Sequence, residues 1–320
     1  VTLNLKSPEA REIALGLVAR ADAVVENFRP GLMERFGLGP DDLAAVKPGI
    51  VLVRISGFGQ TGPRAGDPSF GMIGEAIGGI RHLTGYPPEV TDLPPVRTGV
   101  SLGDSVAGLY GAIGLLAALW EQRAAQPGPG TPARIVDVAL TESVLSLLEG
   151  ILPEYGALGR VRGPHGARIP TAAPSSAYAC ADSAWVLIGA NSQPLFRRLA
   201  GLMGRPELAE DPRFLDNPSR VNNVGDLDAE IGAWTAERPA DAIVADAQYR
   251  AREAVRPAPD PVLERDILHP APVPRFAGPG PSEGIAWTGP AIGAHNDEVY
   301  GKLLGLPAER LAALRDSGTI

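Results

Sequence analysis

Asp104 occupies the position in this sequence that most suggests chemistry. It follows Gly103 and precedes the long apolar run Ser105–Trp120, where we expect a helix to begin. As a helix N-cap, its carboxylate would accept a backbone N–H, which is the common role of an isolated aspartate at such a position. As a nucleophile, the same carboxylate would be kept anionic by the positive end of the helix dipole and could attack an electrophilic carbon. The residue and its neighbours leave both interpretations open.

The segment Gly57–Gly62 matches the pattern G-x-G-x-x-G and follows an apolar run that we interpret as a strand. In a dinucleotide site, a helix must begin at the third glycine so that its backbone N–H groups face the pyrophosphate. Here Pro63, Gly66 and Pro68 follow instead, and these residues oppose a helix. We therefore do not interpret this segment as a nicotinamide-cofactor site.

Other common catalytic arrangements are absent from the sequence. The four histidines are scattered, no H-E-x-x-H pattern or metal-spaced pair of carboxylates occurs, and Cys180 is the only cysteine. We therefore expect no metal site and no internal disulfide. The sequence also lacks the G-x-S-x-G pattern of serine hydrolases and the lysine-containing phosphate-binding loop.

The composition excludes some classes of partner. The chain has 320 residues, a net charge of −8 and 44% hydrophobic residues, so it lacks the basic excess that neutralises nucleic-acid phosphates. Its first residues do not form a signal-peptide pattern. The apolar run Ser105–Trp120 is interrupted by glycines and is shorter than a membrane span. We expect a soluble cytoplasmic protein that binds neither nucleic acid nor membrane.

The elements that must position Asp104 alternate between helix and strand. Apolar patterns and turn residues predict helices near residues 7–20, 70–81, 104–124 and 141–151, and buried strands at 23–25, 50–55 and 135–139. This order is typical of a parallel α/β sheet covered by helices, with ligands at the carboxyl ends of its strands. Because the helix 104–124 is almost entirely apolar, we expect it to be largely buried.

The second half of the chain differs in character. Residues 177–180 and 184–189 predict an antiparallel strand pair, and helices are expected at 195–203 and 227–236. Between Arg256 and Pro290 proline dominates, and we expect little regular structure there. We divide the chain into a large domain (1–150), a linker (151–174), a small α+β domain (175–250), and a return segment with C-terminal helices of the large domain (251–320).

Five segments resemble, in the same order, the signature blocks of family III CoA-transferases, a family that includes formyl-CoA and carnitine CoA-transferases and also α-methylacyl-CoA racemases. The segments are Val25–Gly31 (VENFRPG), Ile55–Pro63 (ISGFGQTGP), Gly103–Gly108 (GDSVAG), Asp211–Phe214 (DPRF) and Gly293–Val299 (GAHNDEV). The resemblance implies that family's α/β fold: a Rossmann-like parallel-sheet domain, here without the N-terminal strand and helix units with which family members begin, and a smaller α+β domain.

The resemblance also implies a chemistry and a set of site residues. Asp104 takes the place of the family's nucleophile, which forms an acyl anhydride and then an aspartyl-CoA thioester. The family's CoA contacts fall on six residues: Leu3, Lys6, Asn27, Phe28, Arg29 and Arg35. Arginine suits this role, because its planar guanidinium can grip the phosphates of CoA with two hydrogen bonds. The implied substrates are an acyl-CoA and a carboxylic acid, with no tightly bound cofactor and no metal. The family's glycine-rich loop, which closes over the intermediate, falls at about 163–170.

Two alternatives accompany this interpretation. The related racemases pair their aspartate with a histidine that abstracts or returns a proton; this chain has Phe70 at the matching position, which favours the transferase. The second alternative is a truncated, inactive acyl-CoA-binding protein, since the N-terminal units and a small-domain segment between Ala242 and Tyr249 are absent. His165 and Arg168 could meet a second carboxylate of the acceptor, so we lean to a dicarboxylic acid. Because family members interlock as rings, we also expect a homodimer.

Overall fold

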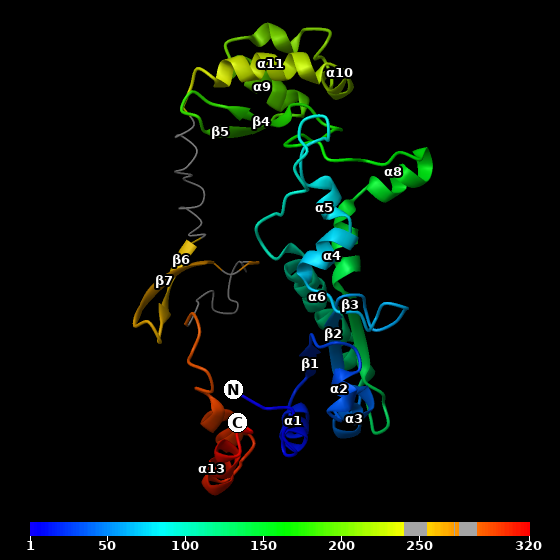
Figure 1. The fold of residues 1–320 in the computed structure, drawn as a ribbon, viewed down its shortest axis with the longest axis vertical. Coiled ribbons are helices and arrows are strands. Elements are labelled where there is room, and N and C mark those ends of the chain that lie inside the picture. Colours follow the sequence, from blue (N-terminus) through cyan, green and yellow to red (C-terminus); the bar gives the residue numbers. More distant parts are fainter. Residues whose placement is uncertain (240–254, 272, 275–286) are drawn as a thin grey trace. The chain divides into compact units, whose positions relative to one another are not determined.

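The computed structural model describes residues 1–239, 255–271, 273–274 and 287–320. The chain divides into two compact units: residues 1–81, 97–161 and 257–320 form the first, and residues 82–96 and 162–256 form the second. Most elements of the first unit are labelled in Figure 1; α7, η1 and η3 are not. In chain order they are α1 Ala10–Val18, β1 Ala23–Glu26, α2 Leu32–Arg35, α3 Pro40–Val46, β2 Val51–Ser56, α4 Gly71–Ile77, α5 Ile80–Leu83 (which continues into the second unit), α6 Leu102–Ala125, β3 Arg134–Ala139, α7 Leu140–Leu145, η1 Ser146–Leu148, α8 Ile151–Leu158, β6 Val255–Asp260 (which begins at the end of the second), β7 Arg265–Pro270, η3 Asp297–Leu303 and α13 Ala308–Asp316.

A three-stranded parallel sheet in the order β1-β2-β3 is the centre of the first unit. Strand β2 lies in the middle, and its successive side chains point to opposite faces of the sheet. Leu52 belongs to a core with α1 and α3, whereas Val51 and Val53 belong to a core with α6. Both faces are therefore covered, and the predicted parallel α/β architecture is confirmed.

Helix α6 packs on this sheet through small residues. Gly103, Ala107, Gly111 and Ala118 are buried on one side of the helix. A side chain at Gly111 would meet Ile55 and Val53, and one at Gly114 would meet Val136. The glycines therefore allow the helix backbone to approach β2 and β3 closely.

The opposite side of α6 contradicts the prediction of a largely buried helix. Leu109, Ile113, Leu116 and Trp120 recur at helical spacing and are 65%, 63%, 68% and 78% exposed. By length and composition the helix could cross a membrane, and 28% of its most apolar window is buried. The other face of the helix packs on the parallel sheet, whereas this apolar stripe is left exposed. The prediction failed because composition does not distinguish a buried helix from one with an unpartnered apolar face.

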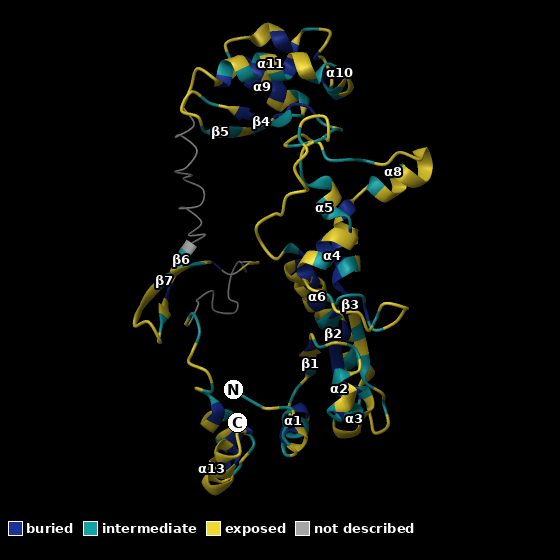
Figure 2. Ribbon diagram, in the orientation of Figure 1, coloured by how far each residue is buried: buried dark blue, intermediate teal, exposed yellow. Residues whose placement is uncertain are grey.

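The second unit is a small α+β domain. It contains β4 Ser175–Ala179, β5 Trp185–Gly189, α9 Gln193–Leu202, η2 Pro206–Ala209, α10 Asn217–Asn222 and α11 Val224–Thr235. Strands β4 and β5 are antiparallel, as predicted, and one side of the pair packs with α9 and α11 around a core that includes Phe196, Phe214 and Leu227. Figure 2 shows this buried layer beneath the exposed outer turns of the helices.

One segment contains regular structure that the sequence did not predict. Strands β6 and β7 form a two-stranded sheet where we expected little regular structure. The carboxylate of Asp260 accepts the backbone N–H groups of Val262 and Leu263, and this hydrogen-bonded turn reverses the chain despite the flanking prolines. Prolines are tolerated because each strand of a two-stranded sheet has a free edge. The small-domain segment between Ala242 and Tyr249 lies outside the described residues.

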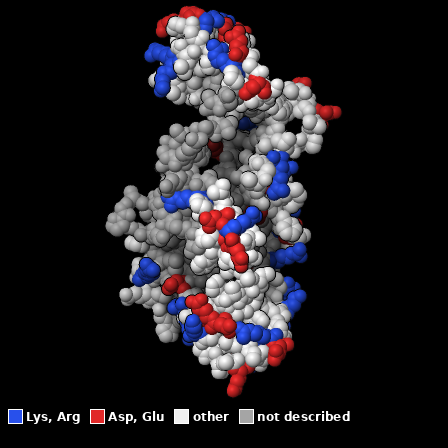
Figure 3. All heavy atoms as spheres, turned by 90° about the vertical axis from the view of Figure 1, so that its left-hand side faces the viewer, with Lys and Arg blue, Asp and Glu red and all other residues white. Residues whose placement is uncertain are grey.

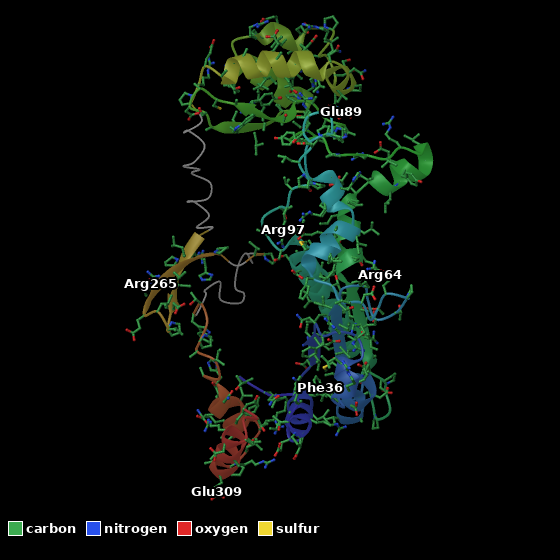
Figure 4. All side chains as sticks on the ribbon, in the orientation of Figure 1. Phe36, Arg64, Glu89, Arg97, Arg265 and Glu309 are labelled. Atoms are coloured by element: carbon green, nitrogen blue, oxygen red, sulfur yellow. The ribbon has the colours of Figure 1, made fainter. Side chains whose placement is uncertain are left out.

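The segment His82–Val96 belongs to the second unit, although the sequence analysis placed it within the large domain. The chain leaves the first unit after Arg81 and returns at Arg97, which is labelled in Figure 4. Both guanidinium groups lie near the fully buried carboxylate of Glu75, at 3.7 and 3.8 Å. The predicted domain limits at 150, 174 and 250 therefore stay a prediction. The second unit also contains residues 82–96, which that prediction did not include.

Arg220 provides a test of the second unit. It is 1% exposed, and its guanidinium donates to the backbone oxygens of Ala173, Asn191 and Phe214 and to Oε1 of Gln193. Removing it leaves several buried acceptors without donors, each of which costs about 1–3 kcal/mol. We expect Arg220→Ala to lower the free energy of unfolding of this unit by at least ~3 kcal/mol in urea denaturation. Arg197→Ala, on the exposed side of α9, should change it by less than ~0.5 kcal/mol. Equal effects would contradict the anchoring role.

Candidate active site

A cavity of about 290 Å³ lies in the first unit at the carboxyl ends of the parallel strands. This is the edge at which open α/β sheets bind ligands. Its lining comes from the loop after β1, the end of β2, the loop before α4, and the starts of α6 and α7. The lining residues are Asn27, Phe28, Arg29, Pro30, Ile55, Ser56, Gly57, Asp67, Ser69, Phe70, Asp104 and Leu140.

Asp104 lies in the first turn of α6 and not at its N-cap. The helix begins at Leu102, after Ser101, so the N-cap interpretation of Asp104 is wrong. The side chain is exposed and accepts no hydrogen bond from any described residue. Its carboxylate lies against Gly71, the first residue of α4, where a Cβ atom would collide with it. The carboxylate is therefore accessible to a ligand in this cavity.

The loop after β1 contributes three of the predicted CoA contacts to this cavity. Asn27, Phe28 and Arg29 all line it together with Asp104. Arg29 is exposed, and no ion pair joins it to another described residue. On the face drawn in Figure 3, basic and acidic residues are interspersed without a broad field of one sign. Among the residues that line the cavity, Arg29 is the single basic one.

The other three predicted CoA contacts do not line the cavity. Leu3 packs with the C-terminal helices around Tyr300 and Leu314. Lys6 and Arg35 are exposed, at the start of the chain and at the end of α2 respectively. The structure thus brings together Asn27, Phe28, Arg29 and Asp104 and leaves these three outside that group, and their role stays a prediction.

The glycine-rich segment Gly57–Gly62 follows β2 at the edge of the cavity, and Gly59 and Gly62 adopt backbone conformations with positive φ. Gly59 has φ +84°, a conformation that side chains other than glycine rarely adopt. The N–H of Gln60 donates to Asp137 on β3 at 2.9 Å, which fixes the loop to the sheet. Arg64, labelled in Figure 4, stacks on Phe58 with 4.1 Å between the guanidinium and the ring centre. No helix begins at the third glycine, Gly62, and the next helix along the chain, α4, begins at Gly71.

The segment 163–170 lies in the second unit. Arg168 forms an ion pair with Asp228, and the Tyr178 hydroxyl donates to the same carboxylate at 2.6 Å. Burial, followed by this hydrogen bond, raises the pKa of the Tyr178 hydroxyl. Because the charge of Arg168 is already balanced, this residue gives little support to the idea that it meets a second substrate carboxylate.

Sequence reasoning missed several residues of the site. Asp67 and Ser69 line the cavity from the loop before α4, and the only signal for them was their position between two predicted elements. Arg54 and Glu26 lie beneath the loop 27–29 and are buried. An arginine in the otherwise apolar run Ile50–Ile55 was a detectable signal, because buried charges need a partner.

The chemistry available in this cavity is limited by its residue types. Among its lining residues are two carboxylates, Asp67 and Asp104, one guanidinium and no histidine. The described residues contain no group of three or more His, Cys, Asp or Glu side chains that could hold a metal ion. The arrangement can bind an anion through Arg29 and offer a free carboxylate to an electrophile.

Comparison with known proteins gives consistent results. A sequence model described as CoA-transferase family III matches residues 1–247. The chain is similar to succinyl-CoA–D-citramalate CoA-transferase of Chloroflexus aurantiacus, at 41% identity over 98% of this chain and 80% of that protein. It is also similar to the beta subunit of succinyl-CoA–L-malate CoA-transferase of the same organism, at 34% identity over 100% of this chain and 82% of that subunit.

The fold is similar to that of a solved structure from the same group. A CAIB/BAIF family protein from Brucella suis superposes with a TM-score of 0.76 and 27% identity, over 95% of this chain and 81% of that one. Sequence and fold agree over nearly the whole chain. The protein therefore belongs to CoA-transferase family III and is a transferase enzyme.

Proposed function

We propose that this protein transfers CoA from an acyl-CoA thioester to a carboxylic acid, with Asp104 as the covalent nucleophile. The observation that carries the proposal is the geometry of one cavity: a carboxylate without a hydrogen-bond partner among the described residues lies beside the loop Asn27–Arg29. That loop supplies an unpaired guanidinium for an anionic ligand, and Asp104 supplies the reacting group.

In the proposed mechanism an oxygen of Asp104 attacks the thioester carbonyl carbon of the donor. The carbon–sulfur bond breaks, and the product is an acyl–aspartyl anhydride with a free CoA thiolate. The thiolate then attacks the aspartyl carbonyl and releases the donor acid, which leaves an aspartyl-CoA thioester. The acceptor carboxylate takes CoA by the reverse sequence and restores the Asp104 carboxylate. Covalent catalysis of this kind divides one difficult exchange into steps of similar energy.

Racemisation is disfavoured by the surroundings of Asp104. Proton abstraction and return need an acid–base partner for the aspartate within hydrogen-bond reach. Phe70, at the position where the related racemases carry histidine, lines the cavity and is 77% exposed. A phenyl ring cannot transfer a proton, so the chain's own residues support nucleophilic catalysis.

For substrates, we propose succinyl-CoA as donor and a dicarboxylic acid as acceptor. Two similar proteins are described as succinyl-CoA transferases, one acting on D-citramalate and the other on L-malate. Both acceptors carry two carboxylates. The support comes from these relatives, since Arg168 is paired with Asp228 within the second unit.

We also propose that two copies of the chain assemble through α6. The exposed stripe Leu109, Ile113, Leu116 and Trp120 is continuous along one side of the helix, and soluble monomers rarely expose such a contiguous apolar surface. One relative is named as the beta subunit of an enzyme, so pairing with a different chain is the competing arrangement.

Asp104→Asn tests the nucleophile. Asparagine has nearly the same shape as aspartate but its amide does not attack a thioester, so CoA exchange should fall by more than ~10³-fold while CoA affinity stays the same. Incubation of the wild type with acyl-CoA and then hydroxylamine should leave a hydroxamate at Asp104, identified by peptide mass spectrometry. Wild-type exchange in the Asn variant would disprove the role.

Gly71→Ala provides an independent check that keeps the carboxylate. The new methyl group would displace the Asp104 side chain, because it would collide with the carboxylate at Oδ2 and Cγ. We expect exchange to fall while the fold is retained, since the end of a flexible side chain can move. The matched control is Gly201→Ala in α9, where a Cβ atom meets nothing within 4 Å. CoA binding without exchange in the wild type would instead support an inactive binding protein.

Arg29→Ala tests the CoA contact. Loss of a charge-assisted hydrogen bond to a phosphate should weaken CoA binding by ~1.5–3 kcal/mol in isothermal titration calorimetry. Arg35→Ala should have a comparable effect if the resemblance extends to α2, and dephospho-CoA should be less affected by at least one of the two changes. Arg123→Ala, near the far end of α6 from Asp104, is the control. Unchanged affinity in both test variants would refute the assignment.

Leu116→Glu tests the assembly. Light scattering should give about twice the 33.3 kDa chain mass for the wild type and the chain mass for the variant, because a charge would have to be buried in the interface. Leu202→Glu, on the exposed side of α9, should leave the mass unchanged. A wild type that is a monomer at micromolar concentration would contradict the homodimer.

A further inference from the structure

A buried arginine lies directly beneath the loop that lines the cavity. Arg54 is in the middle of β2, is 5% exposed, and pairs in register with Glu26, the last residue of β1. The two side chains therefore lie next to each other on the same face of the parallel sheet. An ionisable pair in a sheet core is costly to desolvate, so its contacts need an explanation.

The Arg54 guanidinium has two acidic partners. Its Nε donates to Oε1 of Glu26 at 2.7 Å, and its two terminal nitrogens donate to the carboxylate of Glu34, at 2.8 and 3.3 Å. Burial alone would lower the pKa of Arg54, but the hydrogen bonds to Glu34 and Glu26 outweigh it and raise that pKa. The hydrogen bond to Arg54 lowers the pKa of Glu34. Arg54 and Glu34 are therefore charged at neutral pH.

Only one of the two glutamates contacts the loop. The free oxygen of Glu26, Oε2, accepts the backbone N–H of Phe28 at 2.7 Å. Glu34 lies in α2, beyond the turn at Gly31, and its side chain is 42% exposed. Glu26 thus uses one oxygen to hold Arg54 and the other to hold the backbone between Asn27 and Arg29.

Replacing a buried ion pair by apolar residues is often neutral or stabilising, so stability alone does not account for this arrangement. What an apolar pair could not provide is an acceptor for the Phe28 N–H. Binding is favoured when a loop is already held in its bound conformation, because ordering it then costs no further entropy.

We propose that Glu26, held in place by Arg54, is a positioning residue that fixes the backbone of the loop Asn27–Arg29 for CoA binding, and that Glu34 only completes the charge around Arg54. The inference rests on the proposed function, in which this loop contacts CoA. It makes Glu26 a determinant of affinity for the acyl-CoA and not of the chemical step.

Glu26→Gln and Glu34→Gln form a matched pair for the test. Each replaces one carboxylate of the same guanidinium by an isosteric amide. In Glu26→Gln the single remaining acceptor oxygen cannot serve both Arg54 and Phe28, whereas Glu34→Gln leaves the Phe28 hydrogen bond intact. Glu26→Asp keeps the charge but is too short to reach both groups, and it replaces the Gln variant if that variant does not fold.

We expect Glu26→Gln to raise KM for acyl-CoA roughly three- to tenfold with kcat changed less than about twofold, because loop contacts bind substrate and transition state equally. Glu34→Gln should leave KM within about twofold of the wild type. A purely structural role would lower the active fraction, and hence the apparent kcat, without changing KM. Hydrogen–deuterium exchange of the backbone at 27–31, measured without ligand, should accelerate at least about fivefold in Glu26→Gln only.

The possible outcomes distinguish failure of this inference from failure of the proposed function. If Arg29→Ala weakens CoA binding but Glu26→Gln changes neither KM nor exchange at 27–31, the positioning role is overturned and the proposed function stands. Equal KM effects in the two Gln variants would also overturn it. If neither Arg29→Ala nor Arg35→Ala changes the affinity for CoA, the assignment of the loop as a CoA contact fails and this inference fails with it, whereas the role of Asp104 is decided separately by Asp104→Asn.

Discussion

The parallel pairing of β2 with strands on both sides determines which loops of this protein can meet. In the register of this sheet, Arg54 of β2 lies beside Glu26 of β1 on one side and beside Asp137 of β3 on the other. Parallel strands end at one edge of a sheet, so the loop after β1, the glycine-rich rim after β2 and the start of α7 all converge there. Helix α6 then crosses β2 and β3 with its small residues, and this packing brings Asp104 to that edge.

Close backbone approach, and not hydrogen bonding, places the Asp104 carboxylate. Gly71 and Gly103 lie against each other where α4 meets α6. A side chain at Gly71 would collide with Asp104, and one at Gly103 would collide with the backbone of Gly71. This contact leaves the carboxylate oxygens without donors among the described residues, which suits a group that has to react. By contrast, the carboxylate of Glu26 has both oxygens occupied and acts only on its neighbours. Under the two proposals, the same functional group reacts at Asp104 and only holds a loop at Glu26, because its surroundings differ.

Much of the fold could be predicted from local sequence, because buried strands and capped helices depend on neighbouring residues. The strands around 23–25, 50–55 and 135–139 and the antiparallel pair of the second unit appear in the structure close to their predicted positions. The predictions failed where distant contacts decide. A partner would decide whether the apolar stripe of α6 is covered. Contacts between distant residues, such as the hydrogen bond from the Gly166 N–H to the Gly85 oxygen, decide that 82–96 belongs to the second unit.

The candidate site shows the same division. Asp104 and the loop Asn27–Arg29 were found from short motifs, whereas Asp67 and Ser69 carry no pattern of their own and reach the cavity only because a loop folds back toward α4. Arg54 could be recognised in the sequence as a charged residue in an apolar strand. Its two partners, Glu26 and Glu34, lie before and after the loop that follows β1, and no sequence spacing rule predicts that both contact Arg54.

The identity of the residues around Asp104 bears on the choice between the two chemistries of the family. Proton transfer at carbon requires a second group that changes protonation during the reaction. The residues that line this cavity include no histidine, and their second carboxylate, Asp67, is ion-paired with Arg64 at 2.9 Å. Nucleophilic attack requires only an unpaired anion, a nearby cationic contact for the substrate and space for the acyl group. Asp104 and Arg29 offer the first two of these, so Phe70, at the position where the related racemases carry histidine, favours the proposed transfer over racemisation.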